Sequence, residues 1–207
     1  MHRWVHDGNL SLLTDLYELT MAGAYYADGT SGDLAAFELS VRSLPPSRNF
    51  LVAAGIDDAV DSLEVMEFGE DEIGYLESLE RFDPGFLDHL AEWRFTGDVV
   101  AVAEGTLVFG AEPLMRVSGP LLDTQIVETL LLNTVGFQTM IASKAARVTI
   151  AAQGRRFVDF GARRSHGADA ALRAARAAFI GGASATSMVL AGSMFDLPVT
   201  GTMAHSY

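Results

Sequence analysis

Residues 156–202, RFVDFGARRSHGADAALRAARAAFIGGASATSMVLAGSMFDLPVTGT, decide the fold class. The segment opens with RFVDFG, a short apolar stretch typical of a strand, and continues into residues 167–180, whose apolar side chains recur at helical spacing. A glycine pair follows, then a predicted helix over 184–195 and a predicted strand over 197–202. Strands that alternate with helices at this spacing indicate βαβ units and a parallel sheet.

The chain before this segment changes character at Pro120. Residues 121–152 carry apolar side chains on nearly every helical face, which predicts one long buried helix. The residues before Pro120 mix both kinds of element. Their patterns predict helices over 12–27, 49–66, 71–81 and 84–93, a strand over 34–42, and three strands joined by turns within 97–119. Such an order favours an α+β fold with an antiparallel sheet.

We therefore expect an α/β protein of two domains. Residues 1–119 would form an N-terminal α+β domain, and residues 120–207 the first βα units of an α/β barrel. A closed barrel needs about eight strands and typically about 250 residues, whereas about three barrel-like strands follow Pro120. We therefore expect the barrel to be incomplete and the chain to be the N-terminal part of a longer enzyme. A gene fragment, a truncated form and one piece of a split protein all remain open.

Composition places the protein among folded, core-forming chains. Hydrophobic residues make up 49% of the 207 residues and charged residues 20%, a balance typical of globular proteins. The sequence has no cysteine, which excludes disulfides, thiolate metal ligands and a cysteine nucleophile. The first ten residues contain no apolar run of signal-peptide length, and no stretch approaches the roughly 20 apolar residues of a membrane span. We therefore expect a cytoplasmic protein without a membrane partner.

Charge is distributed unevenly along the chain. The net charge of −13 disfavours a nucleic-acid partner, which normally meets a basic surface. Residues 57–92 hold 13 acidic side chains and a single basic one, whereas residues 144–176 hold eight lysines and arginines and two acids. The second segment is predicted to bind an anion. For Arg173 and Arg176 a solvated helix face is an equally good interpretation, but arginines beside glycines in residues 154–167 are well placed to bind phosphate.

Three segments lie at or just beyond the carboxyl ends of the predicted parallel strands: 160–164, 181–187 and 202–205. Ligands bind at that edge of parallel sheets, so the topology predicts a site there. An aromatic ring can stack, glycines allow close approach of the backbone, and arginines neutralise phosphate. Each segment also has a purely structural interpretation. Residues 160–164 can be a strand end with a turn, residues 181–187 an ordinary helix N-cap, and the histidine in 202–205 a side chain whose hydrogen bonds are all made within the fold.

Five motifs occur in order along the chain: LLTDLYELTMAGAYY (12–26), RNFLVAAGIDDAV (48–60), EPLMRVSGP (112–120), DFGARRSHG (159–167) and GTMAHS (201–206). In these motifs the chain resembles the nicotinate phosphoribosyltransferases, from about Leu12 to Tyr207. The resemblance implies a type II phosphoribosyltransferase fold. It also implies formation of nicotinate mononucleotide and pyrophosphate from nicotinate and phosphoribosyl pyrophosphate, in the salvage route of NAD biosynthesis. The near alternatives are nicotinamide and quinolinate phosphoribosyltransferases.

The resemblance implies which residues bind nicotinate. Phe160 matches the phenylalanine that stacks on the pyridine ring, a contact suited to a flat ligand. Tyr17 matches a tyrosine that covers the other face of the ring from the partner subunit, so a homodimer with shared active sites is expected. Ser187 and Thr202 match polar contacts to nicotinate. Met188 departs from the family, which usually has an asparagine after the Thr-Ser pair.

The resemblance also implies how phosphate groups and ATP are used. Arg163 and Arg164 match cations that face the pyrophosphate of the substrate. His205 matches the histidine whose phosphorylation couples ATP hydrolysis to the transfer, so that the enzyme is both a glycosyltransferase and a ligase. Mg²⁺ is expected to accompany the pyrophosphate.

Two readings compete with the active enzyme. One is a non-catalytic remnant that keeps the fold elements and a dimerisation surface. The other is a phosphohistidine carrier that uses His205 alone, which would have no need of the ring-stacking pair Tyr17 and Phe160. We expect the 207-residue chain by itself to be inactive.

Overall fold

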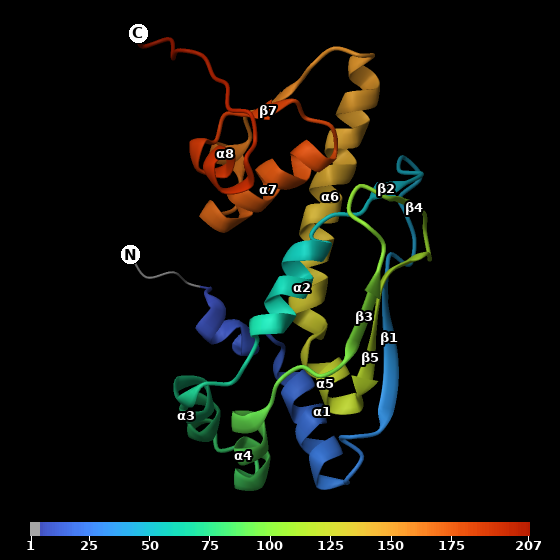
Figure 1. Ribbon diagram of the computed structural model, residues 1–207, viewed down its shortest axis with the longest axis vertical. Helices are drawn as coiled ribbons and strands as arrows, with labels where there is room; N and C mark the ends of the chain where they lie inside the picture. The colour runs from blue at the N-terminus through green and yellow to red at the C-terminus, as the bar shows by residue number, and fades with distance from the viewer. Residues whose placement is uncertain (1–4) are drawn as a thin grey trace. The chain divides into compact units, whose positions relative to one another are not determined.

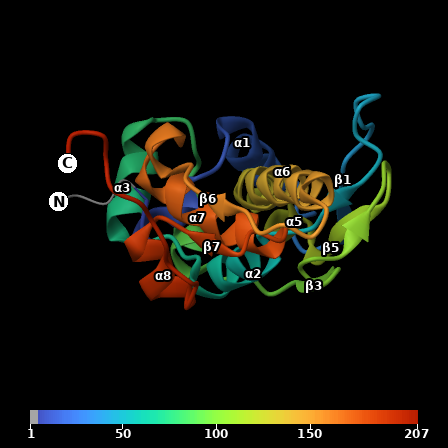
Figure 2. The same cartoon turned by 90° about the horizontal axis from the view of Figure 1, so that it is seen from above.

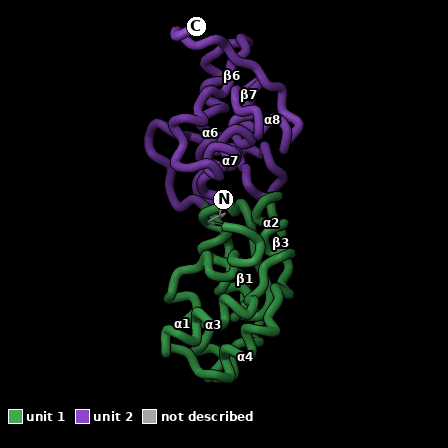
Figure 3. Tube along the Cα trace, turned by 90° about the vertical axis from the view of Figure 1, so that its left-hand side faces the viewer, with its two compact units in different colours: residues 1–40, 57–101, 113–134 green, residues 41–56, 102–112, 135–207 purple. Residues whose placement is uncertain are grey.

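The computed structural model describes residues 5–207, which divide into two compact units (Figure 3). Unit 1 comprises the described residues up to Ser40, together with residues 57–101 and 113–134. Unit 2 comprises residues 41–56, 102–112 and 135–207. The units interleave along the chain, and neither begins or ends at 119/120. The division into two domains between residues 119 and 120 stays a prediction.

An antiparallel sheet forms the framework of unit 1. Strand β5 (Pro113–Pro120) lies between β1 (Leu34–Ser40) and β3 (Asp98–Ala101), as Figures 1 and 2 show. Val117 of β5 is opposite both Phe37 and Val99. Residues directly opposite each other share a face of the sheet, so these apolar side chains line one face together. The antiparallel sheet expected from the sequence is confirmed.

Helices surround the core of unit 1. They are η1 (Asp7–Leu12), α1 (Leu16–Ala27), α2 (Ile56–Val65, whose first residue belongs to unit 2), α3 (Glu70–Ser78), α4 (Pro84–Glu92) and α5 (Leu121–Ile126). Helix α4 begins where the sequence predicts, because the Asp83 carboxylate accepts a hydrogen bond from the Gly85 amide at 2.8 Å and Pro84 takes the first helical position. Helix α1 packs against α5, and Leu19, Phe86 and Leu90 are buried.

The single helix predicted over residues 49–66 is wrong. A short strand, β2 (Leu51–Val52), pairs antiparallel with β4 (Leu107–Val108), and α2 starts only after Gly55. The apolar run LVAA fits a strand or a buried helix equally well by periodicity. Long-range hydrogen bonds decide the outcome, because the Val52 amide donates to the Ser143 hydroxyl at 2.8 Å and pairing with β4 satisfies the rest of the strand.

The helix predicted over residues 121–152 is divided at Val127 into α5 and α6 (Glu128–Ala152). The sequence predicts a buried helix, but only part of α6 is buried. Val135 and Ala142 are fully buried, whereas Ile150 near its C-terminal end is 64% exposed. No helix within residues 5–207 is long and apolar enough to span a membrane.

The βαβ arrangement predicted for the last third of the chain is confirmed in unit 2. Strand β6 (Val158–Asp159), helix α7 (Ala168–Ile180) and strand β7 (Ala185–Thr186) follow one another, and the two strands pair in parallel. The later boundaries differ from the prediction. Helix α8 (Val189–Phe195) is shorter than expected because β7 takes up the beginning of the segment. The strand expected over 197–202 is reduced to one parallel bridge between Val199 and Thr186.

Candidate functional site

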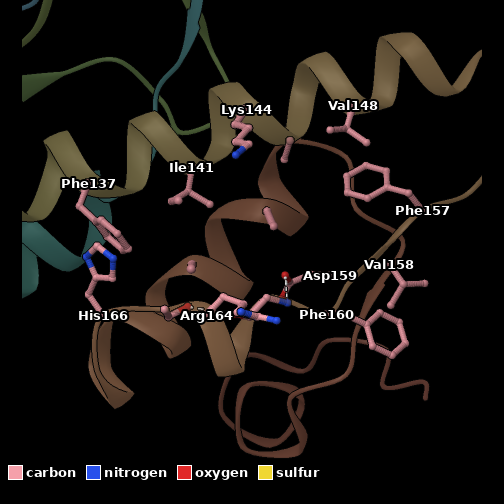
Figure 4. A pocket seen from close by; sticks show the side chains of 15 residues that line it. Phe137, Ile141, Lys144, Val148, Phe157, Val158, Asp159, Phe160, Arg164 and His166 are labelled. Carbon is pink, nitrogen blue, oxygen red and sulfur yellow. Dashed lines mark hydrogen bonds between the residues drawn. The ribbon is translucent and has the colours of Figure 1, made fainter. Parts of the chain in front are cut away.

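A cavity of about 480 Å³ lies in unit 2 between α6, the end of β6 and α7 (Figure 4). Helix α6 contributes one face of side chains spaced three or four residues apart, among them Phe137, Ile141, Lys144 and Val148. The remaining lining residues come from β6, the loop after it and α7: Phe157, Val158, Asp159, Phe160, Gly161, Arg164, Ser165, His166, Ala174 and Ala178. The cavity therefore combines apolar walls with several charged groups.

Phe160 lies at the carboxyl end of β6, where the sequence places it. Its side chain is 48% exposed, so much of the ring surface is open to a ligand. The turn that follows is held by the Asp159 carboxylate, which accepts a hydrogen bond from the Gly161 amide at 2.9 Å. An exposed aromatic ring on a fixed turn can stack against a flat molecule without a large rearrangement.

Basic side chains lie around the cavity. Lys144 points from α6 toward the cavity and His166 lies beside Phe137 (Figure 4). Arg164 also lines the cavity, while its neighbour Arg163 shares the short helix η2 (Ala162–Arg164) but is not a lining residue. Among residues 5–207 no ion pair involves Arg163 or Arg164, and both side chains are exposed. Both guanidinium groups are therefore available to an anion.

Ser187 is placed next to this region by the backbone. It follows β7, and its amide donates to the Asp159 carbonyl oxygen at 2.9 Å, so the loop after β7 is tied to the end of β6. Thr202 and His205 lie farther along, in residues 201–207, which are exposed and extend away from β7 and α8 (Figure 1). None of these three residues lines the cavity. The structure therefore brings together Phe160 and Arg164, but not Thr202 or His205.

Tyr17 belongs to α1 in unit 1 and remains 45% exposed. Its pKa is raised by burial of the hydroxyl, by a hydrogen bond to the Glu128 carboxylate and by the charges of Glu128 and Glu18. Because nearly half of the residue is exposed, we regard the two carboxylates as the dominant cause. Glu18 is fully buried and accepts a hydrogen bond from the Thr129 hydroxyl at 2.5 Å. The Tyr17 hydroxyl is thus held as a protonated donor on a polar cluster within unit 1.

Two cations of the basic segment 144–176 serve the fold instead of a ligand. Arg147 donates to the Phe50 carbonyl oxygen at 2.7 Å, and its guanidinium lies 4.8 Å from the centre of the Phe50 ring. Arg176 forms an ion pair with Glu104 at 2.7 Å in which both side chains are largely buried. For Arg176 the solvated helix face considered from the sequence is wrong, because the side chain is 18% exposed and is paired with Glu104.

The Glu104 carboxylate is the centre of this buried pair. It also accepts hydrogen bonds from the amides of Gly55 and Ile56, at 2.6 and 3.0 Å. Burial acts to raise the pKa of Glu104, but the hydrogen bonds and charge of Arg176 and the two amides outweigh it and hold the pKa below its usual value. Glu104 is therefore ionised at neutral pH and joins α7 to the start of α2.

Comparison with known proteins identifies the family. The sequence profile described as the nicotinate phosphoribosyltransferase (NAPRTase) N-terminal domain matches residues 12–136, which is more than half of the chain. The chain belongs to the nicotinate phosphoribosyltransferase family. Curated family members include the enzyme of Mycobacterium tuberculosis, 50% identical over 95% of this chain and 42% of its own length. The enzyme of Bacillus subtilis is 45% identical, over 97% of this chain and 41% of its own length.

Similar solved structures confirm the fold class. Human nicotinic acid phosphoribosyltransferase superposes with a TM-score of 0.86 and 39% identity, over 93% of this chain and 39% of the human chain. A nicotinate-nucleotide pyrophosphorylase from Pyrococcus furiosus superposes with a TM-score of 0.79 and 26% identity, over the whole of this chain and 46% of its own. The chain has the type II phosphoribosyltransferase fold and spans about two fifths of the length of the curated family members.

Among the cavity residues that the sequence analysis did not single out are an aromatic and two basic side chains: Phe137, Lys144 and His166. A signal for them existed in each case. Phe137, Ile141 and Lys144 recur at helical spacing and therefore share a face of α6, and His166 directly follows the paired arginines. The pattern does not reveal which face of α6 meets the end of β6, because that depends on how the helix packs within unit 2.

Proposed function

We propose that the chain carries the nicotinate-binding part of a nicotinate phosphoribosyltransferase, an enzyme of NAD salvage. The single observation that carries this proposal is the position of Phe160 and Arg164 on one cavity at the carboxyl end of a parallel strand. Phe160 offers an exposed ring to the pyridine of nicotinate. Arg164 offers an unpaired guanidinium to an anion. Membership of the family supports the same substrate pair, nicotinate and phosphoribosyl pyrophosphate.

The reaction assigns distinct tasks to these side chains. The ribose–pyrophosphate bond breaks through a transition state with positive charge on the sugar, while the pyridine nitrogen of nicotinate forms the new bond. Phe160 holds the ring in the plane from which its nitrogen can attack, which lowers the entropic cost of the encounter. Arg163 and Arg164 bind the departing pyrophosphate, whose negative charge grows as the bond breaks.

Tyr17 and His205 complete the proposal with two finer features. Tyr17 would cover the second face of the nicotinate ring in a homodimer, which its 45% exposure allows. His205 would accept a phosphoryl group from ATP, and its exposure gives a second substrate access to the imidazole. A neutral imidazole nitrogen is a competent nucleophile.

Mg²⁺ is proposed to bind together with the pyrophosphate group of the substrate. Within residues 5–207 no group of three or more His, Asp or Glu side chains gathers as a metal site would require. Since Mg²⁺ usually keeps several waters and binds substrate phosphates with only one or two carboxylates, the ion would be held mainly by the substrate's own oxygens. When bound, it neutralises charge on the leaving group.

The proposal is tested by calorimetry with three ligands and by an assay of product. The purified chain should bind nicotinate in preference to nicotinamide, because an arginine-rich site favours a carboxylate. Membership of the family predicts that it also prefers nicotinate to quinolinate. With phosphoribosyl pyrophosphate and ATP present, formation of nicotinate mononucleotide is then measured. Binding without product supports the non-catalytic alternative. Absence of nicotinate binding, or a preference for either analogue, contradicts the proposed substrate.

A further inference from the structure

The Asp159 carboxylate connects two loops at the end of the parallel strands. Its Oδ1 accepts a hydrogen bond from the Gly161 amide at 2.9 Å, and its Oδ2 accepts one from the Thr186 hydroxyl at 3.2 Å. The Asp159 carbonyl oxygen accepts a third bond, from the Ser187 amide at 2.9 Å. One residue therefore contacts the loop that carries Phe160 and the loop that carries Ser187.

Thr186 extends this connection to Met188, because its hydroxyl group both accepts and donates a hydrogen bond. The residue is 1% exposed, and its hydroxyl oxygen accepts a hydrogen bond from the Met188 amide at 3.1 Å while its proton goes to Asp159. The bonds run from Met188 through Thr186 to Asp159, and the Gly161 amide meets the other carboxylate oxygen. Hydrogen bonds to an ionised acceptor are stronger than those between neutral groups. The bonds that the Asp159 carboxylate accepts are therefore expected to be the strongest in this series of hydrogen bonds.

The Asp159 carboxylate leaves little space beside Gly161. A Cβ atom added at Gly161 would lie 2.9 Å from Asp159 Oδ1, closer than ordinary contact allows. A larger residue at position 161 would require the Asp159 carboxylate to shift. The Phe160 turn and the Asp159 carboxylate thus have to fit together.

We propose that Asp159 is a positioning residue, whose carboxylate sets the spacing between the Phe160 loop and the Ser187 loop and thereby the shape of the site for a flat ligand. The proposal rests on the proposed function for the identity of that ligand, nicotinate. Asp159 forms no ion pair with Arg163 or Arg164 among residues 5–207. The carboxylate therefore holds the loops without neutralising the two cations that an anionic ligand would use.

Amide hydrogen exchange and nicotinate calorimetry on four variants of the whole chain test this role. Asp159→Ala should speed exchange of the Gly161 amide, which loses its acceptor, and of the Ser187 amide, whose loop loses the bond from the Thr186 hydroxyl although the Asp159 carbonyl oxygen remains. Both exchange rates and the dissociation constant for nicotinate should rise by about tenfold. Asp159→Asn keeps an acceptor for Gly161 and should stay within about threefold of the wild type. Thr186→Val should free the Met188 amide and leave Gly161 protected. Asp169→Ala, an exposed acid on α7, is the control for loss of charge.

The outcomes separate positioning from general destabilisation and from failure of the proposed function. Faster exchange in both loops, with rescue by Asn and no effect of the Asp169 variant, supports the proposal. Exchange that changes at Gly161 alone, an Asn variant as impaired as Ala, or unchanged affinity with loosened loops overturns it. If Asp159→Ala does not fold, Asn and Thr186→Val still give these readings. If the wild type binds no nicotinate, the proposed function fails, and the exchange pattern still decides whether Asp159 couples the loops.

Discussion

Replacement of Arg176 by alanine should be among the most destabilising single changes in unit 2. The substitution removes two hydrogen bonds to Glu104, of 3.0 Å from Nη1 and 2.7 Å from Nη2. The Glu104 carboxylate would remain among the amides of Gly55 and Ile56 without its counter-charge. A buried charge that loses its partner cannot recover the lost interaction from water.

The size of the effect follows from burial. The side chains of Arg176 and Glu104 are 18% and 12% exposed, so solvent screens their interaction only weakly. Breaking such a pair by removing one partner costs about 3–5 kcal/mol, compared with about 0–1 kcal/mol for a surface pair. We expect the free energy of unfolding to fall by about 3 kcal/mol or more for Arg176→Ala. The double variant Glu104→Gln with Arg176→Met should cost less than Arg176→Ala alone, because it buries no unpaired charge.

The dependence on pH gives a second signature. The pKa of Glu104 is lowered in the folded protein, so the pair contributes its full stability above the ordinary glutamate pKa of about 4.3 and loses it as the pH falls through the folded value. The difference between wild type and Arg176→Ala should therefore be largest near neutral pH and should shrink in acid. Urea unfolding followed by circular dichroism at several pH values measures this difference in the free energy of unfolding. A cost below about 1 kcal/mol, or one that does not shrink in acid, would refute the reasoning.

Four further predictions concern the site and the packing. Phe160→Ala should weaken nicotinate binding by about 0.5–1.5 kcal/mol beyond the lost contact area, whereas Phe179→Ala, outside the cavity, should not; equal calorimetric affinities would remove Phe160 from the site. If Tyr17 completes the partner's pocket, mixing Tyr17→Ala with Phe160→Ala subunits should restore binding at one site per heterodimer, and no recovery would indicate a site within one chain. Labelled ATP should leave an acid-labile, base-stable label that His205→Asn abolishes; a label that persists in the variant excludes His205. Gly181→Ala should lower the free energy of unfolding by about 1–3 kcal/mol, because the added Cβ would lie 2.3 Å from the Ala142 carbonyl oxygen; unchanged urea unfolding would show that α6 and α7 can separate there.

The local sequence pattern predicted an element correctly where strands and helices alternate regularly, or where residues at the end of the element mark its boundary. The alternation after residue 156 predicted the parallel pairing of β6 and β7, and Asp83-Pro84 predicted the start of α4. Pattern failed at β2, because a run of four apolar residues satisfies a helix and a strand alike, and only the Ser143 hydroxyl and strand β4 distinguish them. The same limit explains why α8 was predicted to begin too early.

By itself the sequence determined the family, the βαβ order after residue 156 and the strand end that carries Phe160, since all of these depend on neighbouring residues. Tertiary structure alone decided which arginines are available to a ligand. Arg176 and Glu104 are 72 residues apart, and Arg147 and Phe50 are 97 apart, so no local spacing reveals that these cations are already partnered. Charge counts along a chain record how many cations a segment holds. Whether each binds the fold or a ligand depends on which distant carboxylates and carbonyls come within hydrogen-bonding distance when the chain packs.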